Sequence, residues 1–168
     1  RSQCGVVMQD GYLFSESIAR NIAVGDGEID KERLAEAARI ANIDDYIMRL
    51  PLKYNTLIGQ DGVGLSQGQK QRILIARAVY KNPQYIFLDE ATNALDANNE
   101  RAIVENLTKF YQGKTVVVVA HRLSTVKNAD QIVVIDKGKI IETGKHQELI
   151  ANRGAYYNLV KNQLELGS

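Results

Sequence analysis

The chain of 168 residues is long enough for one domain with a buried core, and its 21 basic and 20 acidic residues leave a net charge of +1. This balance gives no reason to expect a nucleic-acid partner or an electrostatically bound membrane surface. The single cysteine, Cys4, excludes an internal disulfide framework and suits a reducing cytosol, and no apolar run approaches the roughly 20 residues that span a bilayer.

The part of the chain before Leu65 predicts one strand, three helices and a glycine-rich loop. Ser15 and Asp30 can cap two of the helices, and Pro51 ends the third. The second helix carries an apolar face made of Leu34, Ala37, Ala38 and Ala41. The expected elements are a strand over 4–8, helices over 15–21, 30–41 and 44–50, and a loop over 56–64.

The rest of the chain alternates helices with strands, which predicts an α/β fold with a mostly parallel sheet. The β-branched run over 115–120 is typical of a strand buried on both faces. Ile103, Val104 and Leu107 are expected to face inward from their helix. The expected elements are helices over 66–80, 98–111, 145–151 and 155–164, a short helix near Ser124, strands over 85–88 and 115–120, and a hairpin of 131–136 with 139–142.

Two motifs indicate phosphate chemistry. Ser66 opens a helix, where a hydroxyl and free backbone amides can hold an anion at the positive end of the helix dipole. Asp89 and Glu90 end an apolar strand, which is the usual place for a metal ligand and a base in phosphoryl transfer. The simpler interpretations are a serine N-cap and an acidic pair that caps the next segment.

Together these motifs resemble the ATP-binding cassette (ABC) ATPase family, and the resemblance covers essentially the whole chain. Residues Leu65, Ser66, Gln67, Gly68 and Gln69 match the family signature LSGGQ, with Gln67 in place of the first glycine. The resemblance implies that this signature grips the γ-phosphate of an ATP bound to a second nucleotide-binding domain. It also implies that Asp89 is the Walker B aspartate acting on Mg²⁺ and that Glu90 is the general base for the attacking water.

Other positions carry further family roles. Gln9 resembles the Q-loop glutamine, which would ligate Mg²⁺, and His121 stands where the family has the switch histidine that contacts the γ-phosphate. Asp96 belongs to a D-loop, which would communicate across the dimer interface, and Asn93 replaces its usual serine. Residues 59–62 resemble the exporter X-loop that touches the membrane domains, with Gln60 where glutamate is usual; a plain glycine-rich turn is the alternative.

The resemblance implies a partial P-loop NTPase (RecA-like) domain: a helical insert over about 12–82, and a core from 1–11 and 83–168 with the C-terminal hairpin and helices. The sequence contains no P-loop. Gly113-Lys114-Thr115 lacks the earlier glycine of that motif and leads into a strand. We therefore expect the P-loop and the adenine-stacking aromatic residue upstream of Arg1, and an isolated chain that does not hydrolyse ATP. Without the P-loop strand, the strand over 115–120 would have an open edge, which another copy or the hairpin is expected to cover.

The leading function is therefore part of the ATPase domain of an ABC exporter at the cytoplasmic face of the cell membrane. Its cofactors would be ATP and Mg²⁺, and its partners the transmembrane domains and a second nucleotide-binding domain in a head-to-tail dimer. The stretch from Met8 to Ile22 looks similar to bacterial exporters of peptides or bacteriocins. The alternatives are a soluble ABC-type ATPase acting in DNA repair or translation, and a non-catalytic interaction fragment. The short insert between Gln9 and Leu65 argues against the chromosome-maintenance relatives, which carry a long coiled coil there.

Overall fold

The structure is a computed structural model that describes residues 3–8, 11–59, 62–89, 97–119 and 126–166. The chain divides into two compact units, Arg1–Val119 and Ala120–Ser168. Each unit has its own cluster of buried apolar side chains.

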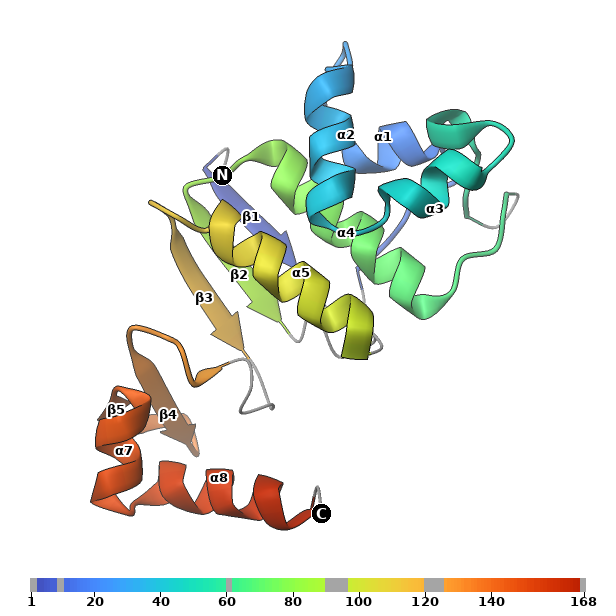
Figure 1. The fold of residues 1–168 in the computed structure, drawn as a ribbon. Helices are drawn as coiled ribbons and strands as arrows, with labels where there is room; N and C mark the ends of the chain where they lie inside the picture. The colour runs from blue at the N-terminus through green and yellow to red at the C-terminus, as the bar shows by residue number, and fades with distance from the viewer. Residues whose placement is uncertain (1–2, 9–10, 60–61, 90–96, 120–125, 167–168) are drawn as a thin grey trace. The chain divides into compact units, whose positions relative to one another are not determined.

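The first unit is built on a parallel three-stranded sheet (Figure 1). Its strands are β1 (Cys4–Val7), β2 (Tyr85–Asp89) and β3 (Thr115–Val119), in that spatial order. Parallel strands need long crossover connections. Here α1 to α4 connect β1 to β2, and α5 connects β2 to β3. The predicted α/β fold with a parallel sheet and a helical insert is confirmed.

The helices of this unit are α1 (Ile18–Ile22), α2 (Lys31–Ile40), α3 (Asp44–Arg49), a 3₁₀ turn (Lys53–Asn55), α4 (Gln67–Lys81) and α5 (Ala97–Phe110). The predicted cap of α1 is wrong: the helix is capped by Ser17, whose hydroxyl oxygen accepts a hydrogen bond from the Arg20 amide at 3.2 Å, and not by Ser15. The segment before α1 stays extended because the Ile58 amide donates to the Glu16 carbonyl at 3.0 Å.

Helix α4 is the central element of the core of this unit, and it packs against α1, α2 and β1. Its buried residues are Gln71, Ile73, Leu74, Ile75, Ala76, Ala78, Val79 and Tyr80. The predicted apolar face of α2 is also buried. On α5, Ile103 and Leu107 are buried as predicted, but Val104 is 42% exposed. Ile103 and Leu107 are four residues apart and share one face of the helix. Val104 follows Ile103 and is rotated from it by about 100° around the helix axis.

The prediction that β3 is buried on both faces is wrong for this chain. Val117, Val118 and Val119 are 45%, 36% and 55% exposed. Successive side chains of a strand point to opposite faces, so neither face of β3 is fully covered, although Val116 packs partly against the core. Within the described part of the chain, β3 pairs only with β2 and forms an edge of the sheet.

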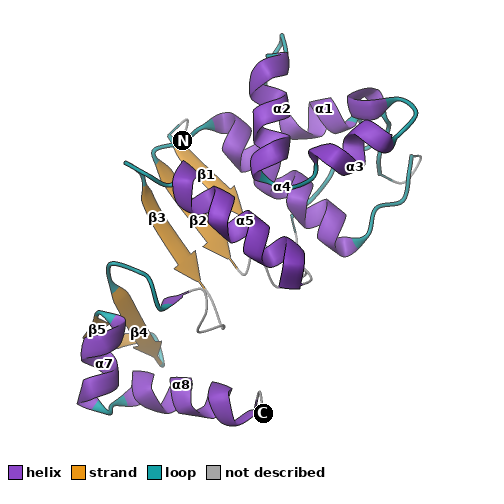
Figure 2. Cartoon of the chain, viewed as in Figure 1, coloured by secondary structure: helices purple, strands orange, loops and turns teal. Residues whose placement is uncertain are grey.

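The second unit is a β-hairpin followed by two helices (Figure 2). The hairpin is confirmed, with a turn at Lys137 and Gly138 whose φ angles are 48° and 75°. Glu142 accepts hydrogen bonds at the start of the second helix, from the amides of Ala155 at 3.1 Å and Tyr156 at 2.7 Å. The elements are β4 (Ile132–Asp136), β5 (Lys139–Gly144), α7 (His146–Asn152) and α8 (Ala155–Leu166).

Two expectations about this region stay predictions. One is that another copy of the chain or the hairpin covers the edge of β3; β4 and β5 themselves pair with each other in a two-stranded sheet. The short helix predicted near Ser124 lies outside the described residues.

Two tyrosines provide a matched test of packing. The Tyr54 hydroxyl donates to the Asp44 carboxylate, whereas the buried Tyr111 hydroxyl has no partner among the described residues. We expect Tyr54→Phe to lower the free energy of unfolding by about 1.5–3 kcal/mol, and Tyr111→Phe to raise it by about 1 kcal/mol because it removes an unsatisfied group. Urea unfolding at neutral pH measures both. Equal losses in the two variants would contradict these contacts.

The same tyrosines predict a loss of stability in alkali. Burial raises the pKa of both hydroxyls above their ordinary value, and at Tyr54 the bond to Asp44 adds to this shift. The protonated form is therefore favoured by folding. The stabilisation that each protonated hydroxyl gives to the folded state is fully present below a pH of about 10. It is lost as the pH rises through the folded-state pKa. Each Tyr→Phe variant should show a shallower alkaline decline than the wild type.

The open edge of β3 predicts self-association of the isolated chain. An exposed apolar strand edge is a template for pairing with another copy, and a charge on such an edge opposes pairing. Val119→Lys should therefore shift the chain toward the monomer in sedimentation velocity. Val24→Lys, at a site that is 49% exposed and not on a strand, is the control. A wild-type chain that stays monomeric, with freely exchanging amides over 116–119, would overturn this prediction.

Candidate phosphate-binding site

The start of α4 holds a capping box, which fixes the predicted signature in place. The Ser66 hydroxyl oxygen accepts a hydrogen bond from the Gln69 amide at 3.2 Å, and the Gln69 side chain accepts one from the Ser66 amide at 2.9 Å. Ser66 therefore has an extended backbone, with φ −64° and ψ 160°, while the helix begins at Gln67. The simpler interpretation of Ser66 as a helix cap is thus correct, and it is compatible with a role toward a ligand.

The first turn of α4 leaves hydrogen-bond donors available. No acceptor among the described residues bonds the amides of Gln67 and Gly68. The Ser66 hydroxyl accepts one hydrogen bond and still has a hydrogen to donate. The first turn also contains no acidic residue, and Ser66 and Gln67 are exposed. This donor set, at the positive end of a 15-residue helix, fits a phosphate group.

Arg72 connects the first turn of α4 to another part of the chain by hydrogen bonds. Its guanidinium donates to the Asn42 carbonyl at 2.7 Å and to the Gly68 carbonyl at 3.3 Å. Asn42 lies in the corner between α2 and α3, with φ 53°. Arg72 therefore joins the first turn of α4 to the corner between α2 and α3. The sequence placed Arg72 beside the signature, but only the fold shows what it contacts.

The carboxyl ends of the three parallel strands lie side by side. Val7 is opposite Leu88, and Asp89 is opposite Val119. Asp89 is the exposed last residue of the central strand, so its carboxylate suits a hard cation such as Mg²⁺. The three strands end one or two residues before Gln9, Glu90 and His121, which are predicted to be functional. These three positions and Asp96 lie outside the described residues.

Gly59, the first residue of the predicted X-loop, lies against the segment that follows Gln9. Gly59 has φ 110°, and a side chain there would begin 2.8 Å from the Ser15 hydroxyl oxygen. An isolated bridge between Ser17 and Leu57 also joins the two segments. The chain thus brings together two segments that the sequence could only place separately. Gln60 and Asp61 lie outside the described residues.

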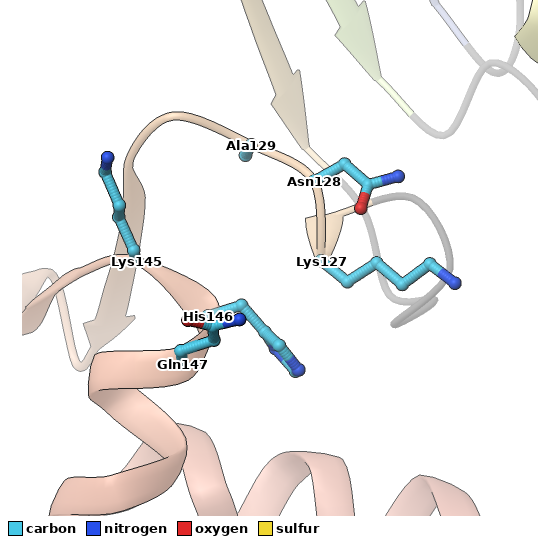
Figure 3. A pocket seen from close by; sticks show the side chains of 6 residues that line it. All are labelled: Lys127, Asn128, Ala129, Lys145, His146 and Gln147. Atoms are coloured by element: carbon cyan, nitrogen blue, oxygen red, sulfur yellow. The ribbon is translucent and has the colours of Figure 1, made fainter.

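The second unit has a shallow pocket of about 350 Å³, which Figure 3 shows with its lining side chains. Its residues are Lys127, Asn128, Ala129, Lys145, His146 and Gln147. His146 Nδ1 lies 2.8 Å from the Tyr156 hydroxyl. None of these residues belongs to the predicted site.

Two further features are absent from the described residues. They contain no cluster of three or more His, Cys, Asp or Glu side chains suited to a metal ion. In the same residues, no helix has the length and apolar character needed to cross a bilayer.

The fold and the site define a parallel α/β domain with a helix start whose free donors fit a phosphate group, and an acidic strand end. Comparison with known proteins specifies the class further. The family model for ABC transporters matches residues 1–93, which is more than half of the chain. The chain belongs to the ABC transporter family.

Individual relatives agree with this assignment. The leukotoxin translocation ATP-binding protein LktB of Mannheimia haemolytica is 50% identical over 166 residues, and so is LktB of Bibersteinia trehalosi. The alignment covers 99% of this chain and 23% of those proteins. A solved structure of a bacterial Atm1-family ABC exporter with ATP bound superposes with a TM-score of 0.91 at 40% identity, over 97% of this chain and 28% of that one. The chain thus spans about a quarter of these relatives, and they favour the exporter class over the soluble ABC-type ATPases.

Proposed function

We propose that this chain is the C-terminal part of the nucleotide-binding domain of an ABC exporter, in which ATP hydrolysis drives transport across a membrane. The observation that carries the proposal is the open first turn of α4, in a chain that superposes on an ATP-bound exporter over 97% of its length. The domain boundaries that we propose are an insert over about 12–82 and a core from 1–11 and 83–168.

The proposed catalytic residues follow the ends of three adjacent strands. Asp89 and Gln9 would hold Mg²⁺, which neutralises charge on the phosphates of bound ATP. Glu90 would accept the proton of the attacking water, and His121 would donate a hydrogen bond to the γ-phosphate. The register of β1, β2 and β3 supports this set, because it brings the preceding strand ends to one edge of the sheet.

The signature, Leu65 to Gln69, is proposed to bind the ATP of a second nucleotide-binding domain. Its donors are the Ser66 hydroxyl and the amides of Gln67 and Gly68, and they are oriented before the ligand arrives because the capping box and Arg72 fix the turn. Preorganised donors lose little entropy on binding. Asp96 would contact the partner domain in the same head-to-tail dimer.

The remaining partners follow from the relatives. The full protein would include transmembrane domains and act at the cytoplasmic face of the inner membrane. The isolated chain is proposed to be inactive, because its sequence lacks a P-loop with the lysine and hydroxyl residue that hold the phosphates and Mg²⁺. Calorimetry with Mg·ATP should accordingly show very weak binding to the isolated chain.

Replacement of the proposed base tests the catalytic assignment. In the full-length transporter, Glu90→Gln should slow hydrolysis by about 10²–10⁴-fold, since a positioned general base contributes that much. ATP binding should persist, because the neutral amide also removes repulsion with the phosphate. Steady-state phosphate release and nucleotide binding measure the two effects. Unchanged turnover in Glu90→Gln would exclude Glu90 as the base.

Replacement of the cap tests the signature. Ser66→Arg puts a bulky cation at the positive end of α4 and blocks the phosphate position. In a transporter with one Ser66→Arg domain and one wild-type domain, the ATP site that uses the mutant signature should fail. Ser66→Ala is the matched control for lost capping, which costs about 1 kcal/mol of stability. If each site responds only to its own chain's signature, the head-to-tail arrangement is wrong.

A further inference from the structure

Arg72 binds one end of a peptide unit whose other end binds Ser66. The Arg72 Nε donates to the Gly68 carbonyl oxygen at 3.3 Å, and the Gln69 amide donates to the Ser66 hydroxyl oxygen at 3.2 Å. The Gly68 carbonyl and the Gln69 amide belong to one planar trans peptide unit, in which the C=O and N–H bonds point in opposite directions. A single peptide unit therefore lies between the guanidinium and the Ser66 hydroxyl.

The end of α2 fixes the position of this guanidinium. A second nitrogen of Arg72 donates to the Asn42 carbonyl oxygen at 2.7 Å. Asn42 is itself held in place, because its amide donates to the Arg39 carbonyl at 3.0 Å. The Ile43 amide donates to the Ala38 carbonyl at 2.9 Å, which completes the Schellman arrangement that closes a helix. A cation is favoured at the carboxyl end of a helix, so the fork of Arg72 is anchored at α2 and reaches α4 with its other arm.

The hydrogen bonds from Arg72 to Ser66 form a series that begins at a permanent positive charge. A hydrogen bond with an ionised donor is roughly twice as strong as a neutral one. A cation on the Gly68 oxygen draws electron density from the peptide unit, so the Gln69 amide becomes a stronger donor to Ser66. Hydrogen bonds in series polarise one another, so the hydroxyl hydrogen of Ser66 becomes a stronger donor in turn.

The capping box alone does not supply this effect. Its bonds join Ser66 and Gln69, both uncharged, and they already set the geometry of the turn. What Arg72 adds is a charge, placed on the far side of the Gly68–Gln69 peptide from Ser66. Ser66 is exposed, and no residue in the described part of the chain accepts its hydroxyl hydrogen. The last donor of the series is therefore available to a ligand.

We propose that Arg72 is a positioning residue for the signature, which acts through the Gly68–Gln69 peptide to align and polarise the Ser66 hydroxyl toward the γ-phosphate. This inference rests on the proposed function, and it adds to that site a residue outside the signature. In this role Arg72 acts through Ser66, so its contribution to turnover depends on the presence of the Ser66 hydroxyl.

A double-mutant cycle in the full-length transporter tests this dependence. With Ser66 present, Arg72→Gln should lower kcat/KM for ATP about fivefold, which lies within the range of couplings between members of one hydrogen-bond network. In a Ser66→Ala background the same change should cost less than about twofold, because the hydroxyl on which Arg72 acts is gone. Arg72→Lys keeps the charge but not the two-armed geometry, so with Ser66 present it should lose less than Arg72→Gln.

Arg77→Gln is the matched control. Arg77 is a second arginine of α4 that donates to carbonyl oxygens, those of Asn21 at 2.7 Å and Tyr12 at 2.9 Å. At 1.5 Å per residue it lies about 16 Å along the helix from Ser66. Residues this far apart act independently, so Arg77→Gln should change kcat/KM by the same factor in both Ser66 backgrounds. If Arg72→Gln also has the same effect in both backgrounds, or no effect, the proposal is overturned.

A binding measurement decides the question if Ser66→Ala has no measurable turnover. It uses the full-length Glu90→Gln transporter and compares Mg·ATP with Mg·ADP, because only ATP carries a γ-phosphate. Arg72→Gln, or Arg72→Lys if Arg72→Gln does not fold, should weaken Mg·ATP binding about threefold or more and change Mg·ADP binding less than about twofold. Equal changes for the two nucleotides, or no change, overturn the proposal. A wild-type transporter that does not hydrolyse ATP would instead refute the proposed function itself.

Discussion

The burial of α4 is the constraint on which the first unit depends. This helix supplies core side chains on several faces and packs on α1, α2 and β1, so its axis cannot move without disturbing the whole insert. Its first turn is nevertheless exposed at Ser66 and Gln67. A buried helix with an exposed N-terminal turn holds its backbone donors in fixed positions. A phosphate-binding turn needs this property. Arg72 and the capping box complete this arrangement with local contacts.

Much of this architecture could be predicted from the sequence, because strong local signals agreed with the global fold. Asp30 and Ser66 cap their helices as expected, and the small residues of α2 form its buried face. The strand before Asp89 and the hairpin at Lys137 and Gly138 also follow from pattern and turn chemistry. These elements are determined by residues close in sequence, which is where pattern arguments are strongest.

The errors arose where distant parts of the chain decide the outcome. Ser15 and Ser17 are both capable caps, and pairing with residues 56–58 selects Ser17. The valines of β3 have the composition of a central strand. Their exposure depends on which strands and helices lie beside β3, and composition does not show this. The hydrogen bonds that join Asn21 to Arg77 span 56 residues of sequence, so no local pattern predicts them. A fully buried asparagine is visible only once the fold is known.

The helix starts of this protein differ in what already occupies them. At α2 the Asp30 carboxylate accepts the amides of Glu32 and Arg33, and at α8 the Glu142 carboxylate accepts two amides in the same way. At both helix starts a side-chain carboxylate of the chain itself occupies the amides, so a second anion cannot bind them. The start of α4 is closed only by an uncharged serine and glutamine. Of these three helix starts, only that of α4 lacks a carboxylate, so it opposes the approach of an anion least.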